Sequence, residues 1–295
     1  MRRLALEPAI PAALVLAMAI FPAPFAALFG HGDPHACDLA LSDRGPSQGH
    51  PFGFDVQGCD LYANVIYGAR PTVTTGLLVT AGVLVVAVIL GGAAGYLGGV
   101  TDAVVGRLAD VVLGFPLILG ALVVLTVTPD RNELTVSAVL VAFGWPAMTR
   151  LMRSTVLGVT GRDYVLAARA LGAPAFRIVL RHVLPNAIGP VLVYATTAVG
   201  GIMVAETTLT FLGVGLPASE ISWGVQLANA QQQFLQHPHL LIAPGAFLSV
   251  TVISFVALGD ALRGALDSAS NQASSRAWMS RTRLLMPSLR KTLRR

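Results

Sequence analysis

The sequence predicts an all-α polytopic membrane protein, and its hydropathy, its low charge and its long apolar runs support that class. Of the 295 residues, 54% are hydrophobic and only 12% are charged, and the mean hydropathy is +0.69. Soluble domains carry about 25% charged residues, so half of the expected charge is missing. This composition excludes a disordered chain and disfavours a soluble enzyme.

Six stretches without Asp, Glu, Lys or Arg predict six transmembrane helices. A helix needs about 20 apolar residues to cross a bilayer core of about 30 Å, and only the fourth run needs flanking residues to reach that length. Strands of a membrane barrel would alternate apolar and polar residues instead. The runs cover residues 9–29, 71–101, 111–129, 134–149, 182–205 and 240–259.

The first run follows Arg2 and Arg3 and therefore also resembles a secretory signal. It is longer than the 7–15 apolar residues of a usual signal core, which favours an uncleaved helix within residues 1–29. Pro22 and Pro24 are expected to kink or end this helix near its far end.

The basic residues predict that both termini are cytoplasmic. Six crossings divide the chain into alternating exposed segments, and one set of segments holds every basic residue except Arg44, Arg70 and Arg131. Basic residues favour the cytoplasmic side. The chain then divides into an extracytoplasmic segment 30–70, a membrane core 71–267 and a basic tail 268–295. The net charge of +5 follows from this bias and requires no nucleic-acid partner. The tail suits either contact with anionic lipid or disorder.

Both cysteines, Cys37 and Cys59, lie in the predicted extracytoplasmic segment. A thiol pair outside the cytoplasm can oxidise and stay oxidised, so we expect a disulfide; the alternative is two unpaired thiols. His31, Asp33 and His35 beside Cys37 also suggest a metal site. Gly32 and Pro34 among them favour an ordinary turn, and no second cluster completes a zinc-type spacing.

The predicted inner segment 150–185 contains an elbow of two short helices joined at a glycine. Residues from Asp163 to Leu171 are good helix formers and are followed by Gly172, a natural helix end. Pro174 can open a second short helix. The small side chains of Ala167 and Ala168 suit docking into a groove of another protein. The residues alone leave open whether the elbow docks there or is an interfacial linker.

This elbow resembles the EAA loop of binding-protein-dependent ABC importer permeases, and further motifs extend the resemblance over residues 50–267. It is most similar to the second, C-type permease subunit of the dipeptide, oligopeptide and nickel group. The matching stretches are Ala167-Ala168-Arg169-Ala170-Leu171-Gly172-Ala173, Leu184-Pro185-Asn186, His50-Pro51-Phe52-Gly53-Phe54-Asp55, Ala94-Gly95-Tyr96-Leu97-Gly98-Gly99, Phe143-Gly144-Trp145-Pro146, Ala205-Glu206 and Leu258-Gly259-Asp260-Ala261-Leu262-Arg263.

The resemblance implies a type I importer permease fold and a pore-forming subunit that moves a peptide-like solute inward. It also implies a second permease subunit, two cytoplasmic ATPase subunits and an extracytoplasmic substrate-binding protein. Coupling to the ATPases would run through the 163–182 loop, with these contact residues: Asp163, Tyr164, Ala167, Ala168, Arg169, Leu171 and Gly172.

We expect no enzyme activity and no cofactor in this chain, with ATP and Mg held by the partner ATPases. The phosphate-binding loop GxxxxGK[ST] needs a lysine, and Lys291 lies in no such pattern. The sequence departs from the family at two positions. Leu166 stands where glutamate is usual, which puts a polar ATPase contact in doubt, and Cys59 replaces a common arginine, which favours the disulfide.

Glu206 is the acidic residue inside a strong apolar stretch. It suits a structural or gating role in the pore. It also permits a different class of protein, a secondary transporter that relays ions through an intramembrane carboxylate. A membrane scaffold without transport is the third alternative, and co-purification of ATPase subunits separates the first class from the other two.

Overall fold

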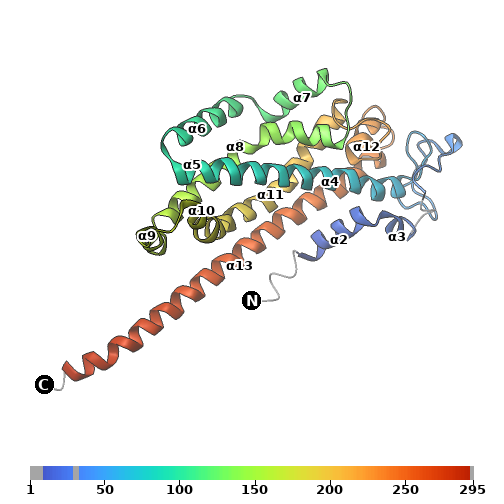
Figure 1. Ribbon diagram of the computed structural model, residues 1–295. Helices are drawn as coiled ribbons and strands as arrows, with labels where there is room; N and C mark the ends of the chain where they lie inside the picture. Colours follow the sequence, from blue (N-terminus) through green and yellow to red (C-terminus); the bar gives the residue numbers. More distant parts are fainter. Residues whose placement is uncertain (1–8, 29–32, 293–295) are drawn as a thin grey trace.

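The computed structural model describes the backbone of residues 9–28 and 33–292, with side chains up to Leu266. All of the regular secondary-structure elements within these residues are helices (Figure 1). The elements are α2 (Ala9–Ile20), α3 (Pro22–Ala26), η1 (Leu39–Leu41), α4 (Leu61–Val86), η2 (Ala87–Gly91), α5 (Gly92–Leu97), α6 (Gly99–Leu113), α7 (Leu117–Val127), α8 (Glu133–Thr160), α9 (Asp163–Ala170), α10 (Ala175–Ile178), η3 (Val179–Val183), α11 (Leu184–Phe211), α12 (Trp223–Ala230) and α13 (His239–Thr292).

Four helical segments within the described residues are long and apolar enough to cross a membrane, and a bent pair raises the number to five. The four are Leu61–Leu97, Glu133–Thr160, Ala175–Phe211 and His239–Leu266. They run along one common direction in Figure 1. The all-helical membrane class is therefore confirmed, whereas the expected number of six spans is not.

The two remaining apolar runs form broken or short helices. The third run falls on α6 and α7, which are bent by 79° at a break, because Gly114 ends one helix and Pro116 precedes the next. The first run gives α2, which ends at Ile20 before Pro22, as the prolines predicted. Arg2 and Arg3 lie outside the described residues.

Helix α4 begins well before the apolar run that predicted it. Asp60 caps its first turn by accepting hydrogen bonds from the N–H groups of Tyr62 and Ala63, which satisfies donors that a helix start leaves free. Ten residues predicted to belong to the extracytoplasmic segment are thus helical. Arg70 interrupts the charge-free run inside the helix, so the run alone placed the boundary too late.

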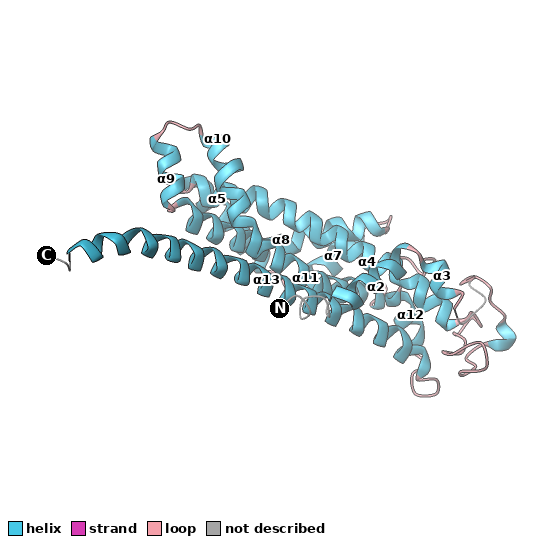
Figure 2. Cartoon of the chain, turned by 90° about the horizontal axis from the view of Figure 1, so that it is seen from below, coloured by secondary structure: helices cyan, strands magenta, loops and turns pink. Residues whose placement is uncertain are grey.

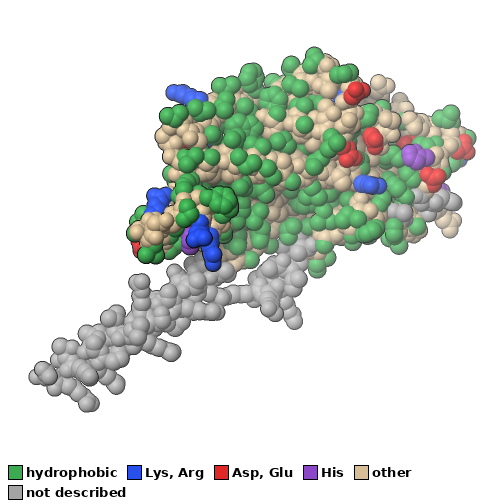
Figure 3. Space-filling model, viewed as in Figure 1, with side chains coloured by type: hydrophobic (Ala, Val, Ile, Leu, Met, Phe, Trp, Pro, Cys, Tyr) green, Lys and Arg blue, Asp and Glu red, His purple; other side chains and the backbone are tan. Residues whose placement is uncertain are grey.

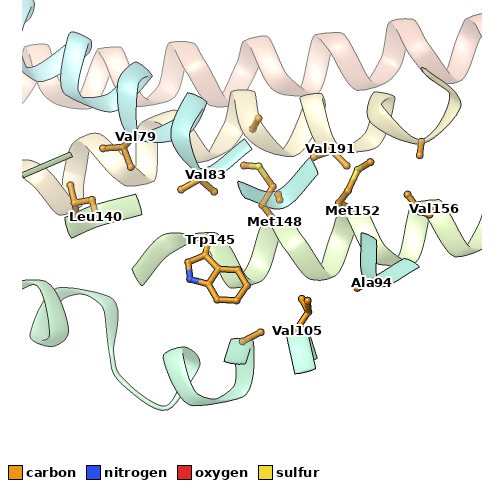
Figure 4. Close-up of a cluster of buried hydrophobic side chains, with 14 of the residues drawn as sticks. Val79, Val83, Ala94, Val105, Leu140, Trp145, Met148, Met152, Val156 and Val191 are labelled. Carbon is orange, nitrogen blue, oxygen red and sulfur yellow. The ribbon is translucent and has the colours of Figure 1, made fainter. Parts of the chain in front are cut away.

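Helix α8 is also longer than predicted and forms the centre of the bundle. It continues to Thr160, so Arg150 and Arg153 lie on a helix and not in the predicted inner loop. Helix α8 packs against α4, α5, α6, α7 and α11. Figure 4 shows Met148, Met152 and Val156 along it, with Val191 of α11 close by. These four side chains are almost completely buried.

Two structural details fix α8 against its neighbours. At Gly91 and Gly95 an added Cβ would lie 2.5 Å from the carbonyl oxygen of Thr149 and 2.8 Å from that of Arg153. Only glycine allows this backbone approach. In addition, the Arg153 guanidinium forms an ion pair with Asp102 of α6. Asp110, also on α6, likewise pairs with an arginine of α8, Arg150.

The first testable prediction concerns this close packing. Gly91→Ala should lower the free energy of unfolding by about 1–3 kcal/mol, the usual cost of overpacking, because the contact atom is backbone. Gly92→Ala is the matched control, since nothing lies within 4 Å of its added Cβ. The measurement is the thermal unfolding midpoint of both variants in one detergent. Equal midpoints for Gly91→Ala and the natural chain would contradict the packing argument.

Candidate functional site

The elbow formed by α9 and α10 lies at one end of the bundle and projects from it (Figure 2). Helix α9 covers Asp163–Ala170 and α10 begins after Pro174, as the sequence predicts. Gly172 has φ of +75°, a conformation that side chains with a Cβ disfavour. The Gly172 N–H donates to the Arg169 carbonyl and the Ala173 N–H to the Ala168 carbonyl. This pair of bonds is a Schellman helix end.

Several large apolar side chains of the elbow are exposed. Leu171 is 88% exposed and Phe176 is 76% exposed, whereas Val165 and Ile178 are buried and anchor the two short helices. Tyr164 and Leu166 are also exposed. Exposed apolar groups gathered at one place mark interaction surfaces in general. The elbow therefore has the form of a docking surface.

Not all of the residues expected at this surface face outward. Asp163, Tyr164, Ala167, Arg169, Leu171 and Gly172 are exposed. Ala168, by contrast, is partly buried and packs against the main hydrophobic core of this chain. Its place on the contact face stays a prediction, and its contact with the core ties this side of α9 to the bundle.

Arg169 contacts its own chain as well. Its guanidinium carbon lies 5.4 Å from the ring centroid of Tyr96 on α5, a distance at which a cation is attracted to an aromatic face. Arg169 therefore ties the elbow to α5. Leu166 is exposed and supplies apolar surface where the family usually has a carboxylate.

Charged side chains separate along the long direction of the molecule (Figure 3). Arg side chains gather near α9 and α10, and Asp and Glu side chains gather near the opposite end. We call these the basic end and the acidic end. The elbow belongs to the basic end, and residues 33–60, which we call the cap, belong to the acidic end.

The cap is held together by a disulfide and by one half-buried carboxylate. The structure joins Cys37 and Cys59, which are 22 residues apart. Asp55 accepts hydrogen bonds from the N–H groups of Gln57 and Cys59 and from the side-chain amide of Asn64 on α4. Burial raises the pKa of Asp55, and these hydrogen bonds oppose the shift. The cap is thus fastened to the start of α4.

The metal hypothesis for this region gains no support. Cys37 is bonded to Cys59, and the Asp33 carboxylate accepts the N–H of His35 at 2.9 Å in a local turn. His31 lies outside the described residues. Within the part of the chain that the structure describes, no group of three potential metal ligands occurs.

Glu206 lies on α11 and is completely buried within the described structure. Its carboxylate accepts a hydrogen bond from the Thr210 hydroxyl at 2.7 Å, and the Leu216 N–H donates to that hydroxyl at 3.0 Å. A buried carboxylate needs such donors. This chain of bonds links the end of α11 to the loop that follows, and the structural or gating role of Glu206 stays a prediction.

Trp223 has an importance at the acidic end that the sequence did not indicate. Its side chain is buried, and the indole N–H donates to the Val65 carbonyl of α4 at 2.8 Å. Gln226, one turn later, donates to the Asn64 carbonyl. The sequence shows Trp223 and Gln226 at a spacing that places both on one face of a helix. It does not indicate their hydrogen-bond partners on α4.

Together these features define a multi-pass helical membrane protein with a docking elbow at one end and a disulfide-bonded cap at the other. A model of the family described as binding-protein-dependent transport system inner membrane component matches residues 87–271. The chain belongs to that family. The family's description places these proteins in the inner membrane, in agreement with the apolar helices.

Curated relatives give the same assignment over most of the chain. The oligopeptide transport system permease protein OppC of Bacillus subtilis is 34% identical over 86% of this chain and 83% of its own length. The dipeptide transport system permease protein DppC of the same organism is 36% identical over 79% and 74%. The glutathione transport system permease protein GsiD of Escherichia coli is 33% identical over 88% and 86%.

The second testable prediction concerns the disulfide. Peptide mapping without reductant should recover Cys37 linked to Cys59, because the structure pairs them within the cap. Reduction should lower stability by on the order of 3 kcal/mol, as expected for a closed loop of this size. Recovery of both residues as free thiols from freshly isolated membranes would exclude the bond.

Proposed function

We propose that this chain is a pore-forming subunit of an ATP-driven importer that moves a peptide-like solute into the cytoplasm. The relatives are named as permeases of oligopeptide, dipeptide and glutathione transport systems, which supports both the class and the solute. A second permease, two ATPase subunits and an extracytoplasmic binding protein would complete the assembly, with ATP and Mg bound by the ATPases.

The exposed apolar elbow is the observation that carries this proposal. It lies at the basic end beside Arg162, Arg177 and Arg181, which are exposed. The excess of basic residues favours a cytoplasmic location for this end, where ATPase subunits would meet it. Leu171 and Phe176 supply the apolar contact, with Ala167 allowing close approach between them and the partner.

The alternative, a secondary transporter that uses Glu206, has less support. A proton or ion relay needs a carboxylate that reaches a water-filled path. Glu206 is fully buried within the described chain and is hydrogen-bonded to Thr210 of its own helix. The relatives are likewise named as subunits of transport systems and so favour the importer.

The third testable prediction is a direct test of the docking surface. Leu171→Asp should reduce co-purification of the ATPase subunits and solute uptake by at least about tenfold. Burying a carboxylate at an apolar contact should cost more than about 1.4 kcal/mol of binding free energy. Leu39→Asp is the matched control, since Leu39 is an exposed leucine of the cap. It should leave co-purification unchanged.

Normal coupled uptake in Leu171→Asp, with the ATPases still bound, would overturn the proposal. A bulky residue at Ala168 would be a poorer test, because Ala168 packs on the chain's own core and its replacement would disturb the permease itself. Membrane insertion and amount of each variant should be matched before uptake is compared.

The fourth testable prediction concerns orientation. A cysteine replacing Arg44 in the cap should react with an impermeant maleimide in sealed cells, and a cysteine replacing Arg162 should react only after the membrane is opened. The natural cysteines are joined to each other and leave the new thiol as the reactive group. Labelling of position 162 from outside would reverse the proposed orientation.

A further inference from the structure

A polar cavity lies at the acidic end, between the cap, α4, α8 and the loop before α12. Its volume is about 620 Å³, which falls within the range of small-molecule sites. Figure 3 shows acidic side chains, histidine and a basic side chain gathered toward this end of the molecule. The charged and polar side chains lining the cavity include those of Asp33, His35, Arg70, Thr74, Glu133 and Glu220.

Three elements bring these charges together. Arg70 and Thr74 lie one turn apart on α4 and therefore share a face. Glu133 stands in the first turn of α8, and the Thr74 hydroxyl donates to its carboxylate at 3.4 Å. Glu133 is also within electrostatic range of both Glu220 and Arg70.

Within the described part of the chain, ion pairs do not neutralise the charged side chains of this cavity. The ion pairs found there are His50–Asp60, Arg150–Asp110 and Arg153–Asp102. Arg70, Glu133 and Glu220 take part in none of them. With three carboxylates against one guanidinium, the cavity favours a cationic group that enters beside the acids.

A second hollow of about 210 Å³ continues from the first and shares Pro34, His35 and residues 219–221 with it. Its further lining includes the amides of Gln57, Asn64, Gln226 and Asn229. The Gln226 side-chain oxygen is buried without a hydrogen-bond partner among the described residues. The side-chain amides of this lining can both donate hydrogen bonds to a peptide main chain and accept them from it. We call the two hollows together the cap groove.

We propose that the cap groove binds the amino-terminal end of a peptide. The ammonium group lies between Glu133 and Glu220, and the main chain follows the amides toward Gln226. This inference rests on the proposed function as an importer of peptide-like solutes and names the chemical group of the solute that this subunit recognises. A binding protein docked here is the competing occupant, but a concave cavity of this volume fits a small solute better than a broad protein contact.

The test uses the purified permease and needs neither uptake nor ATP hydrolysis, so a failure of ATPase coupling does not affect it. Ser219 lines both hollows and is exposed. In Ser219→Cys the new thiol is the reactive one, since Cys37 and Cys59 are bonded. Trialanine should slow maleimide labelling of this thiol, and N-acetyl-trialanine, which has no ammonium, should not. Ser47→Cys on the exposed cap should label at the same rate throughout.

Adding Glu220→Gln or Glu133→Gln should raise the trialanine concentration needed for protection by about tenfold, the loss expected for one charge-assisted hydrogen bond. Asp130→Asn, an exposed carboxylate outside the cap groove, is the matched control and should leave it unchanged. Equal protection by both peptides would overturn the ammonium site. So would the absence of protection at the solubility limit of trialanine, or protection by the binding protein alone.

Discussion

The close backbone contact of η2 and α5 with α8 is the constraint on which the remaining arrangement depends. Lipid tails are as apolar as leucine, so helices in a membrane associate mainly through packing. At Gly91 and Gly95 the chain brings backbone against backbone, with no room for a side chain. Helix α8, which this contact positions, also packs against α4, α6, α7 and α11. The contact therefore influences the placement of the whole bundle.

The elbow inherits its position from that contact. Tyr96 of α5 lies directly after Gly95 and holds the guanidinium of Arg169, while Ala168 rests on the core that α8 organises. The inner side of α9 is therefore fixed to α5 and the core, and the outer side presents Leu171 and its apolar neighbours. A partner that moved this surface would act on the bundle through short, well-packed contacts and not through a loose loop.

The sequence predicted the elements whose signals are local, and missed those that depend on a distant partner. The apolar runs, the helix end at Gly172 and the start after Pro174 follow from chain chemistry alone. The side of α9 that faces outward could not be predicted in this way. Ala167 and Ala168 are the same residue type, and only the position of the core distinguishes them. Likewise Arg70 hid the continuation of α4 toward Asp60, and nothing near Glu133 in sequence indicated Arg70 or Glu220 as its neighbours.

Helix α8 physically connects the two proposed sites. Glu133 lies in its first turn at the cap groove, and the chain passes from its last residue, Thr160, directly into the elbow at Asp163. A helix of 28 residues is about 42 Å long, so one rigid element spans the distance between them. A solute in the cap groove can influence the elbow only if it binds two arrangements of the bundle unequally. In the proposed site, a tilt of α8 against α4 would change the separation of Glu133 and Arg70 and hence the affinity for an ammonium group.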